Sequence, residues 1–162
     1  MILALAMVFP LLTSADQRIE WKPFEQVQIS PTRVDFLRIQ SAKVARDRWG
    51  NIKVQLTVQN TGNEPIHLIT VELAAKSADG TPRGSRGMSY DVDIDQGKAT
   101  IDFVIGHDKA SFVQPGDIII LSLVGVKTSK TYWLQGLGSF PLDPTTNLPL
   151  LSGDVCEAKC QN

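Results

Sequence analysis

Apolar and polar residues alternate strictly between residues 51 and 60, where the chain reads NIKVQLTVQN. Ile52, Val54, Leu56 and Val58 fall on one side of this alternation, and polar residues fall on the other. A period of two residues is typical of a strand that buries one face and exposes the other. The segment therefore predicts a half-buried β-strand.

Comparable runs recur along the chain, and turn residues separate them. A turn at residues 60–65 leads into IHLITVEL, in which His67, Ile69, Val71 and Leu73 are expected to share the inner face. The run IIILSLVGV follows a Pro-Gly-Asp turn and is apolar throughout, which predicts a strand buried on both faces. We expect two further strands in VDFLRIQSAKV and KTYWLQ.

A hairpin is predicted around residues 95–98, between the arms SYDVDID and ATIDFVIG. In such a hairpin Val92 would share the inner face with Ile101. Gly97 would supply the positive φ angle that the turn requires. The segment before it, residues 82–87, contains two glycines and two arginines and is expected to be an exposed loop.

These segments amount to about seven strands with turn signals at short intervals and no convincing amphipathic helix. That pattern predicts an all-β fold, an antiparallel β-sandwich, and it excludes a parallel α/β sheet because no helical crossovers are present. We expect one sandwich over residues 16–135, which includes an extended N-terminal arm at residues 16–32. Residues 136–162 contain three prolines and a pair of cysteines and are expected to form an irregular, ordered tail.

The first fifteen residues are typical of a targeting segment. Residues 1–12 carry no charge, and small residues at Thr13 and Ala15 match a signal-peptidase site. A cleaved signal peptide is the favoured interpretation, with an uncleaved anchor or a buried element as alternatives, because the run is shorter than a membrane span and contains Pro10.

Two cysteines, Cys156 and Cys160, lie close together near the C-terminus. Export would allow them to form a disulfide that pins a local turn. The alternative is a thiol pair that binds a metal, but the two histidines of the chain are distant in sequence.

Composition and motifs exclude several functional classes. The net charge is -1, which argues against a nucleic-acid-binding protein, since phosphate recognition needs an excess of Lys and Arg. The chain has no GxSxG, HExxH, Walker or GxGxxG motif. His67 is interpreted as a packing residue and His107 as an exposed loop residue. We therefore expect that the protein is not an enzyme.

One acidic cluster is a candidate cation site. Asp91, Asp93 and Asp95 alternate along one predicted strand, and Asp102 lies on the partner arm of the predicted hairpin. Carboxylates are the ligands that Ca²⁺ prefers, but the spacing along a strand is too wide for three of them to share one ion unless the strand bends. The alternatives are a Ca²⁺ site and a solvated acidic face that discourages edge pairing. No other cofactor is expected.

The N-terminal arm is a candidate interface. It reads DQRIEWKPFEQVQIS and contains an edge-favouring proline, Pro23. If its apolar side chains do not fold back, they can add to the open sheet edge of another copy. The alternative is that the arm is the first strand of its own sandwich. The interface candidates are Ile19, Trp21, Phe24, Val27 and Ile29.

The stretch VQLTVQNTGNEPIHLITVELAAKSADG, followed later by VQPGDIIILSL, resembles a class of exported immunoglobulin-like domains. This class includes bacterial cell-envelope proteins and subunits of archaeal surface filaments. The resemblance rests on turn chemistry and buried strands over about half of the chain, so it speaks for fold more than for function. It implies an immunoglobulin-like sandwich that is secreted and located at the cell surface or in the periplasm.

Two functions are consistent with these features. The first is a non-catalytic structural or assembly subunit that binds copies of itself, or other cell-surface proteins, through its arm and a sheet edge, and that forms a filament. The second is a monomeric periplasmic or extracellular binding module that acts through its loops. Neither requires nucleic acid, and a membrane would be contacted only through the signal or anchor segment.

Overall fold

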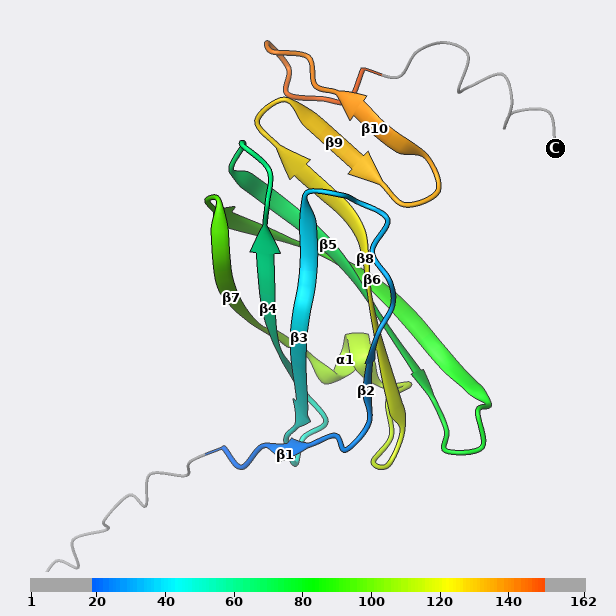
Figure 1. Ribbon diagram of the computed structural model, residues 1–162. Coiled ribbons are helices and arrows are strands. Elements are labelled where there is room, and N and C mark those ends of the chain that lie inside the picture. The colour runs from blue at the N-terminus through cyan, green and yellow to red at the C-terminus, as the bar shows by residue number, and fades with distance from the viewer. Residues whose placement is uncertain (1–18, 151–162) are drawn as a thin grey trace, which may run out of the picture.

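Ten strands form two sheets that pack face to face in residues 19–150, which are the residues that the computed structural model describes (Figure 1). All but one of the strand pairs are antiparallel, so the prediction of an all-β antiparallel sandwich is confirmed. The four-stranded sheet has the order β1 (Lys22–Pro23), β3 (Leu37–Arg46), β4 (Ile52–Asn60), β7 (Gly97–Ile105).

The second sheet is six-stranded and larger. Its central strand, β8 (Ile118–Thr128), pairs with β5 (Ile66–Lys76) along one edge. The other edge of β8 is divided between β9 (Thr131–Leu134) and the parallel strand β2 (Val27–Ile29). The outer strands are β6 (Pro82–Ile94) next to β5 and β10 (Gly138–Pro141) next to β9.

Alternation explains the core between the two sheets. The side chains of Ile52, Val54, Leu56 and Val58 are all buried, as their spacing predicts. On β8 the inward side chains are buried, but Ile120, Ser122 and Val124 between them are only half-buried, so the expectation of a strand buried on both faces holds fully for the inner face alone. A single short helix, α1 (His107–Ala110), joins β7 to the loop before β8 and places Ala110 in the core.

Three local expectations are wrong. Residues 82–87 are the first half of β6 and not a loop, because they pair with the end of β5. His67 is exposed and not inward, since the register of β5 shifts between Ile66 and Leu68. The φ angle of Gly97 is positive, at 123°, but the turn that it serves does not form a hairpin.

The predicted hairpin is instead a crossing between the sheets. β6 pairs with β5 in the large sheet, whereas β7 pairs with β4 along its whole length. Each of the two strands has apolar residues on one face. With β6 in the large sheet and β7 in the small sheet, both apolar faces point into the core between the sheets. The rings of Tyr90 on β6 and Phe103 on β7 therefore stack across the interior, with centroids 4.0 Å apart.

The tail after residue 135 contains one more strand than expected. β9 and β10 form a hairpin in which Trp133 and Phe140 are buried, and residues 141–150 return beside it. This hairpin lies at the end of the sandwich opposite the arm (Figure 1). Within residues 19–150, no helix has the length and apolar character that crossing a membrane would need.

Candidate assembly site

The N-terminal arm spans both sheets at one end of the sandwich. Its first strand, β1, pairs with the end of β3, and the backbone N–H of Phe24 donates to the carbonyl of Val44 over 2.9 Å. The chain then crosses to the large sheet, where β2 runs parallel to β8. Backbone bonds at both ends of β2 hold it there, from Ile119 N–H to Gln26 and from Ser30 N–H to Leu121.

Few apolar contacts hold the arm. No residue from 19 to 33 is buried, and Val34 is the first residue whose side chain enters the core fully. Phe24 and Val27 pack against the core while half-buried. Of the other interface candidates, Trp21 and Ile29 are half-buried, and Ile19 is 49% exposed. The arm therefore belongs to its own sandwich in the single chain, but it is attached mainly through its backbone.

A cavity of about 610 Å³ lies where the arm crosses from one sheet to the other. Its walls come from the arm, from the turn between β3 and β4, and from the turn at residues 115–117. The charged side chains on its walls are Glu20, Lys22, Glu25, Arg46, Asp47, Arg48 and Asp117.

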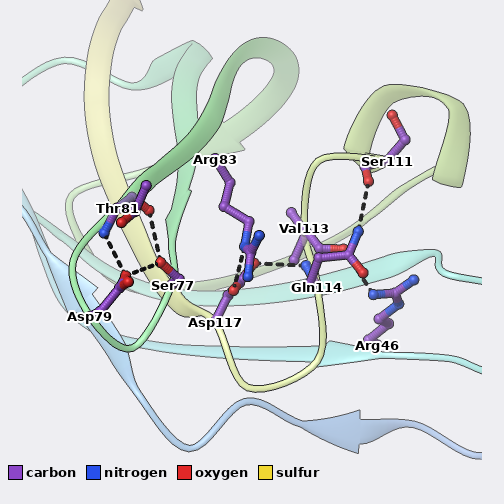
Figure 2. Close-up of polar contacts among 9 residues, drawn as sticks. All are labelled: Arg46, Ser77, Asp79, Thr81, Arg83, Ser111, Val113, Gln114 and Asp117. Carbon is purple, nitrogen blue, oxygen red and sulfur yellow. Dashed lines mark hydrogen bonds and ion pairs between the residues drawn. The ribbon is translucent and has the colours of Figure 1, made fainter.

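Two arginines fix the loop before β8 from opposite sheets (Figure 2). Arg46 on β3 donates from a terminal guanidinium nitrogen to the carbonyl of Val113 over 2.8 Å. Arg83 on β6 donates from Nε to the buried carboxylate of Asp117 over 2.8 Å. That carboxylate also accepts from the backbone N–H of Gln114, over 2.8 Å. Side chains from both sheets therefore hold the far wall of the cavity in place, whereas its near wall is the arm, which few apolar contacts hold.

The sequence identifies Pro115-Gly116-Asp117 as a turn but does not reveal these partners. Arg83 and Asp117 are 34 residues apart in the sequence. No local spacing connects them, because the contact exists only once β6 and the loop before β8 meet in the fold. The sequence gives one indication of a partner, which is that Asp117 directly precedes a buried strand, where a charged side chain needs a partner.

The acidic cluster is spread over two sheets. Asp91 and Asp93 point outward from β6, and Asp95 is exposed in the crossing. Asp102 lies on the outer face of β7, in the other sheet, where it accepts a hydrogen bond of 3.0 Å from the amide of Gln55. In residues 19–150 no group of three or more His, Cys, Asp or Glu side chains is arranged to hold a metal ion.

Three carboxyl groups with lowered pKa values lie in turns and accept hydrogen bonds there. Hydrogen bonds from Ser77 and Thr81 lower the pKa of Asp79 to about 2 in the turn between β5 and β6 (Figure 2). Burial acts to raise the pKa of Asp47, but hydrogen bonds from Asn51 and neighbouring backbone N–H groups outweigh it, so the pKa is lowered. Backbone N–H groups lower the pKa of Asp143 in the same way. Local turn geometry accounts for each of these shifts.

Two sequence predictions fall outside the described residues. They are the signal segment at residues 1–15 and the disulfide between Cys156 and Cys160. Comparison with known proteins gives no further assignment, since no family model, curated protein or solved structure matches the chain.

Proposed function

We propose that this chain is a non-catalytic structural subunit of an exported, cell-surface assembly, and that it joins other copies by exchange of its N-terminal arm. The observation that carries the proposal is the contrast between the arm and the rest of the sandwich. The arm adds strands to both sheets, yet none of its described residues before Val34 is buried.

Exchange of such an arm between copies requires little free energy. When the arm of one copy takes the place of the same arm on another, the contacts of β1 and β2 are remade unchanged, so only the connecting segment must alter its path. That segment is Ser30-Pro31-Thr32-Arg33, which is exposed or half-buried throughout. Residues 29–39 also border a groove of about 410 Å³, so the connection is not packed tightly against β3.

Release of the arm would leave a defined acceptor site. The backbone of residues 119–121 on β8 would lose its parallel partner strand. The core surface that Phe24 and Val27 contact would become exposed. Unpaired strand edges beside apolar surface recruit another strand. A second copy carries the segment that fits this site.

The experiment is a cross-linking test between two populations. In a background with Cys156→Ser and Cys160→Ser, one population carries Gln28→Cys and the other Ile120→Cys, since these residues are register partners in β2 and β8. A short thiol cross-linker should join the two populations only if the arm of one lies on β8 of the other.

A matched control uses Thr57→Cys and Thr100→Cys, which are register partners in β4 and β7, away from the arm. We expect a mixed product from the arm pair and none from the control pair. If the arm pair cross-links only when both cysteines are on the same chain, the arm does not exchange.

A second function has one observation in its favour. The cavity of about 610 Å³ beneath the arm has the size of a small-molecule site. In that case the protein would be a monomeric periplasmic or extracellular binding module, and the arm would be one wall of its ligand site. A chain that remains monomeric at all concentrations, with an arm protected from hydrogen exchange, would favour this second function.

A further inference from the structure

Lys22 and Arg46 lie directly opposite each other where the arm meets the small sheet. They are register partners in the antiparallel pair of β1 and β3. Residues that oppose each other in such a pair have their side chains on the same face. Both side chains also line the cavity of about 610 Å³ beneath the arm. The register therefore places two positive charges together at the cavity wall, which is destabilising unless a negative charge lies between them.

Neither of these positive charges is neutralised within the described residues. Lys22 and Arg46 take part in none of the ion pairs of residues 19–150. A guanidinium presents five N–H donors. In the part of the chain that the structure describes, Arg46 uses one of them, in the hydrogen bond to the carbonyl of Val113. An anion in the cavity would provide acceptors for the others.

The carboxylates on the cavity walls do not provide this negative charge. Asp47 is buried and accepts hydrogen bonds from its own turn, and the buried Asp117 is paired with Arg83. Glu20 and Glu25 are exposed on the arm and form no ion pair within residues 19–150. The two opposed cations are therefore left to interact with a ligand.

The size of the cavity and its other walls indicate an organic anion. Cavities of about 300–1,000 Å³ hold small molecules, so this one is larger than an inorganic ion needs. Pro23, Phe24 and Pro115 add apolar groups to its walls. A guanidinium matches the geometry of a carboxylate or a phosphate, and a lysine ammonium adds a point charge. A carboxylate or phosphate group on an apolar body fits these walls.

We infer that the cavity binds a small organic anion, whose carboxylate or phosphate group lies between Lys22 and Arg46. The inference rests on the second proposed function, the binding module, and deepens it by naming the class of ligand. Lys22 belongs to the arm and Arg46 to β3, so the bound anion joins the arm to the sandwich. Binding therefore stabilises the attached arm.

The test is a calorimetric titration of the full chain with benzoate and with phenyl phosphate, at an ionic strength held constant with sodium chloride. Benzamide has nearly the same shape as benzoate but no charge, and it is the ligand control. We expect at least one of the two anions to bind to a single site and benzamide not to bind. The two probes distinguish a preference for carboxylate from a preference for phosphate. If neither anion binds at millimolar concentration, or if benzamide binds as tightly as benzoate, the inference is overturned.

Lys22→Gln removes one of the two opposed charges and should weaken binding of the anion at least about tenfold. Without ligand, this variant should unfold at the same temperature as the unaltered chain or at a higher one, because the repulsion is relieved. A purely structural role for Lys22 predicts the opposite. The matched control is Lys43→Gln, at an exposed position of β3 outside the cavity, and it should bind the anion normally. Equal affinities in the two variants contradict the inference.

The sign of the ligand charge has its own test. Glu20→Gln combined with Glu25→Gln removes the exposed carboxylates of the arm while preserving the size of their side chains. An anion should bind this double variant more tightly than the unaltered chain, because repulsion from the arm is lost. Weaker binding would show that the arm carboxylates hold the ligand, and it would exclude the proposed anion site.

Hydrogen exchange locates the bound anion. It should slow the exchange of the Phe24 amide, which donates to Val44, and an unchanged rate would place the anion elsewhere and overturn the inference. The cross-linking of Gln28→Cys to Ile120→Cys, without anion, reports separately on the arm. If the anion binds and no mixed product forms, the anion site stands and arm exchange fails. If mixed product forms and no anion binds, arm exchange stands and the anion site fails.

Discussion

Arg83 on β6 and Asp117 before β8 form an ion pair of 2.8 Å in which only one partner reaches solvent. The Asp117 side chain is 2% exposed, whereas the Arg83 side chain is 42% exposed. Water can approach the guanidinium but not the carboxylate. The pair joins the edge strand of the large sheet to the loop that forms the far wall of the cavity.

Replacement of Arg83 by alanine should reduce the free energy of unfolding by about 1–3 kcal/mol, because the buried carboxylate keeps only its backbone donor, Gln114. Urea unfolding at neutral pH measures the loss. Arg86→Ala on the same strand is the control and should change stability by less than about 0.5 kcal/mol. Equal losses in both variants would show that the ion pair has no special role.

Asn60 connects three segments through one buried amide. Its Nδ2 donates to the carbonyls of Glu64 and Ile94, over 3.0 and 3.2 Å, and its Oδ1 accepts from Gly62 N–H over 2.9 Å. Asn60→Ala should cost about 2–3 kcal/mol, since these partners lose their bonds in a dry environment. Thermal and urea unfolding measure it, with the exposed Asn63→Ala as a neutral control. A loss below about 1 kcal/mol would contradict this assignment.

Glu64 makes stability depend on pH. A hydrogen bond from Thr128 and the nearby Lys130 ammonium lower the pKa of Glu64 below its usual 4.5 in the folded state. A lowered folded-state pKa contributes stability that is present above the unfolded pKa and is lost as the pH falls through the folded one. We expect the free energy of unfolding to decrease below about pH 4.5.

Glu64→Gln removes this titration, so its stability should decrease less steeply with acid than that of the unaltered chain. Other carboxyls with lowered pKa values remain, among them Asp47 and Asp143, so some dependence will persist. Unfolding curves recorded at intervals between pH 2.5 and 7 make the comparison. Parallel stability profiles for the two chains would refute a contribution from Glu64.

Gly50 and Gly80 both need a positive φ angle, but only Gly50 also lacks space for a side chain. Both have a φ angle near +90°, but an added Cβ at Gly50 would lie 2.5 Å from Nδ1 of His107, whereas at Gly80 nothing lies within 4 Å. Gly80→Ala should cost about 1–2 kcal/mol from backbone strain alone. Gly50→Ala should cost up to about 1 kcal/mol more, because the exposed side chain of His107 must also turn away from the added Cβ. Chemical denaturation of both variants tests the difference, and equal costs would argue against the steric contact.

Sequence alternation was sufficient to predict the central strands. The buried faces of β4 and β5 follow from residues such as Val54 and Val71, because a period of two leaves only one way to bury an apolar face. The same alternation predicts β6 and β7 as strands correctly, but the predicted pairing of the two strands in a hairpin is wrong. A short connection is compatible with a hairpin and with a crossing between sheets, and only the partners β5 and β4 decide between them.

The candidate site was less accessible to sequence reasoning. Apolar residues and a proline identify the arm in the sequence, but its two short pairings depend on where β3 and β8 present free edges. The ion pair of Arg83 with Asp117 joins residues with no sequence relationship. Alternation predicts an inward His67, because it cannot reveal the register shift in β5.

The parallel pairing of β2 with β8 has a mechanical consequence. In Figure 1 the described chain begins at one end of the sandwich and finishes at the other, and both β2 and β8 run from the first end toward the second. Tension between residues 19 and 150 would therefore pull β2 and β8 past each other along their length. Bonds loaded in this direction share the force and resist together, whereas bonds loaded across the strands would open one after another.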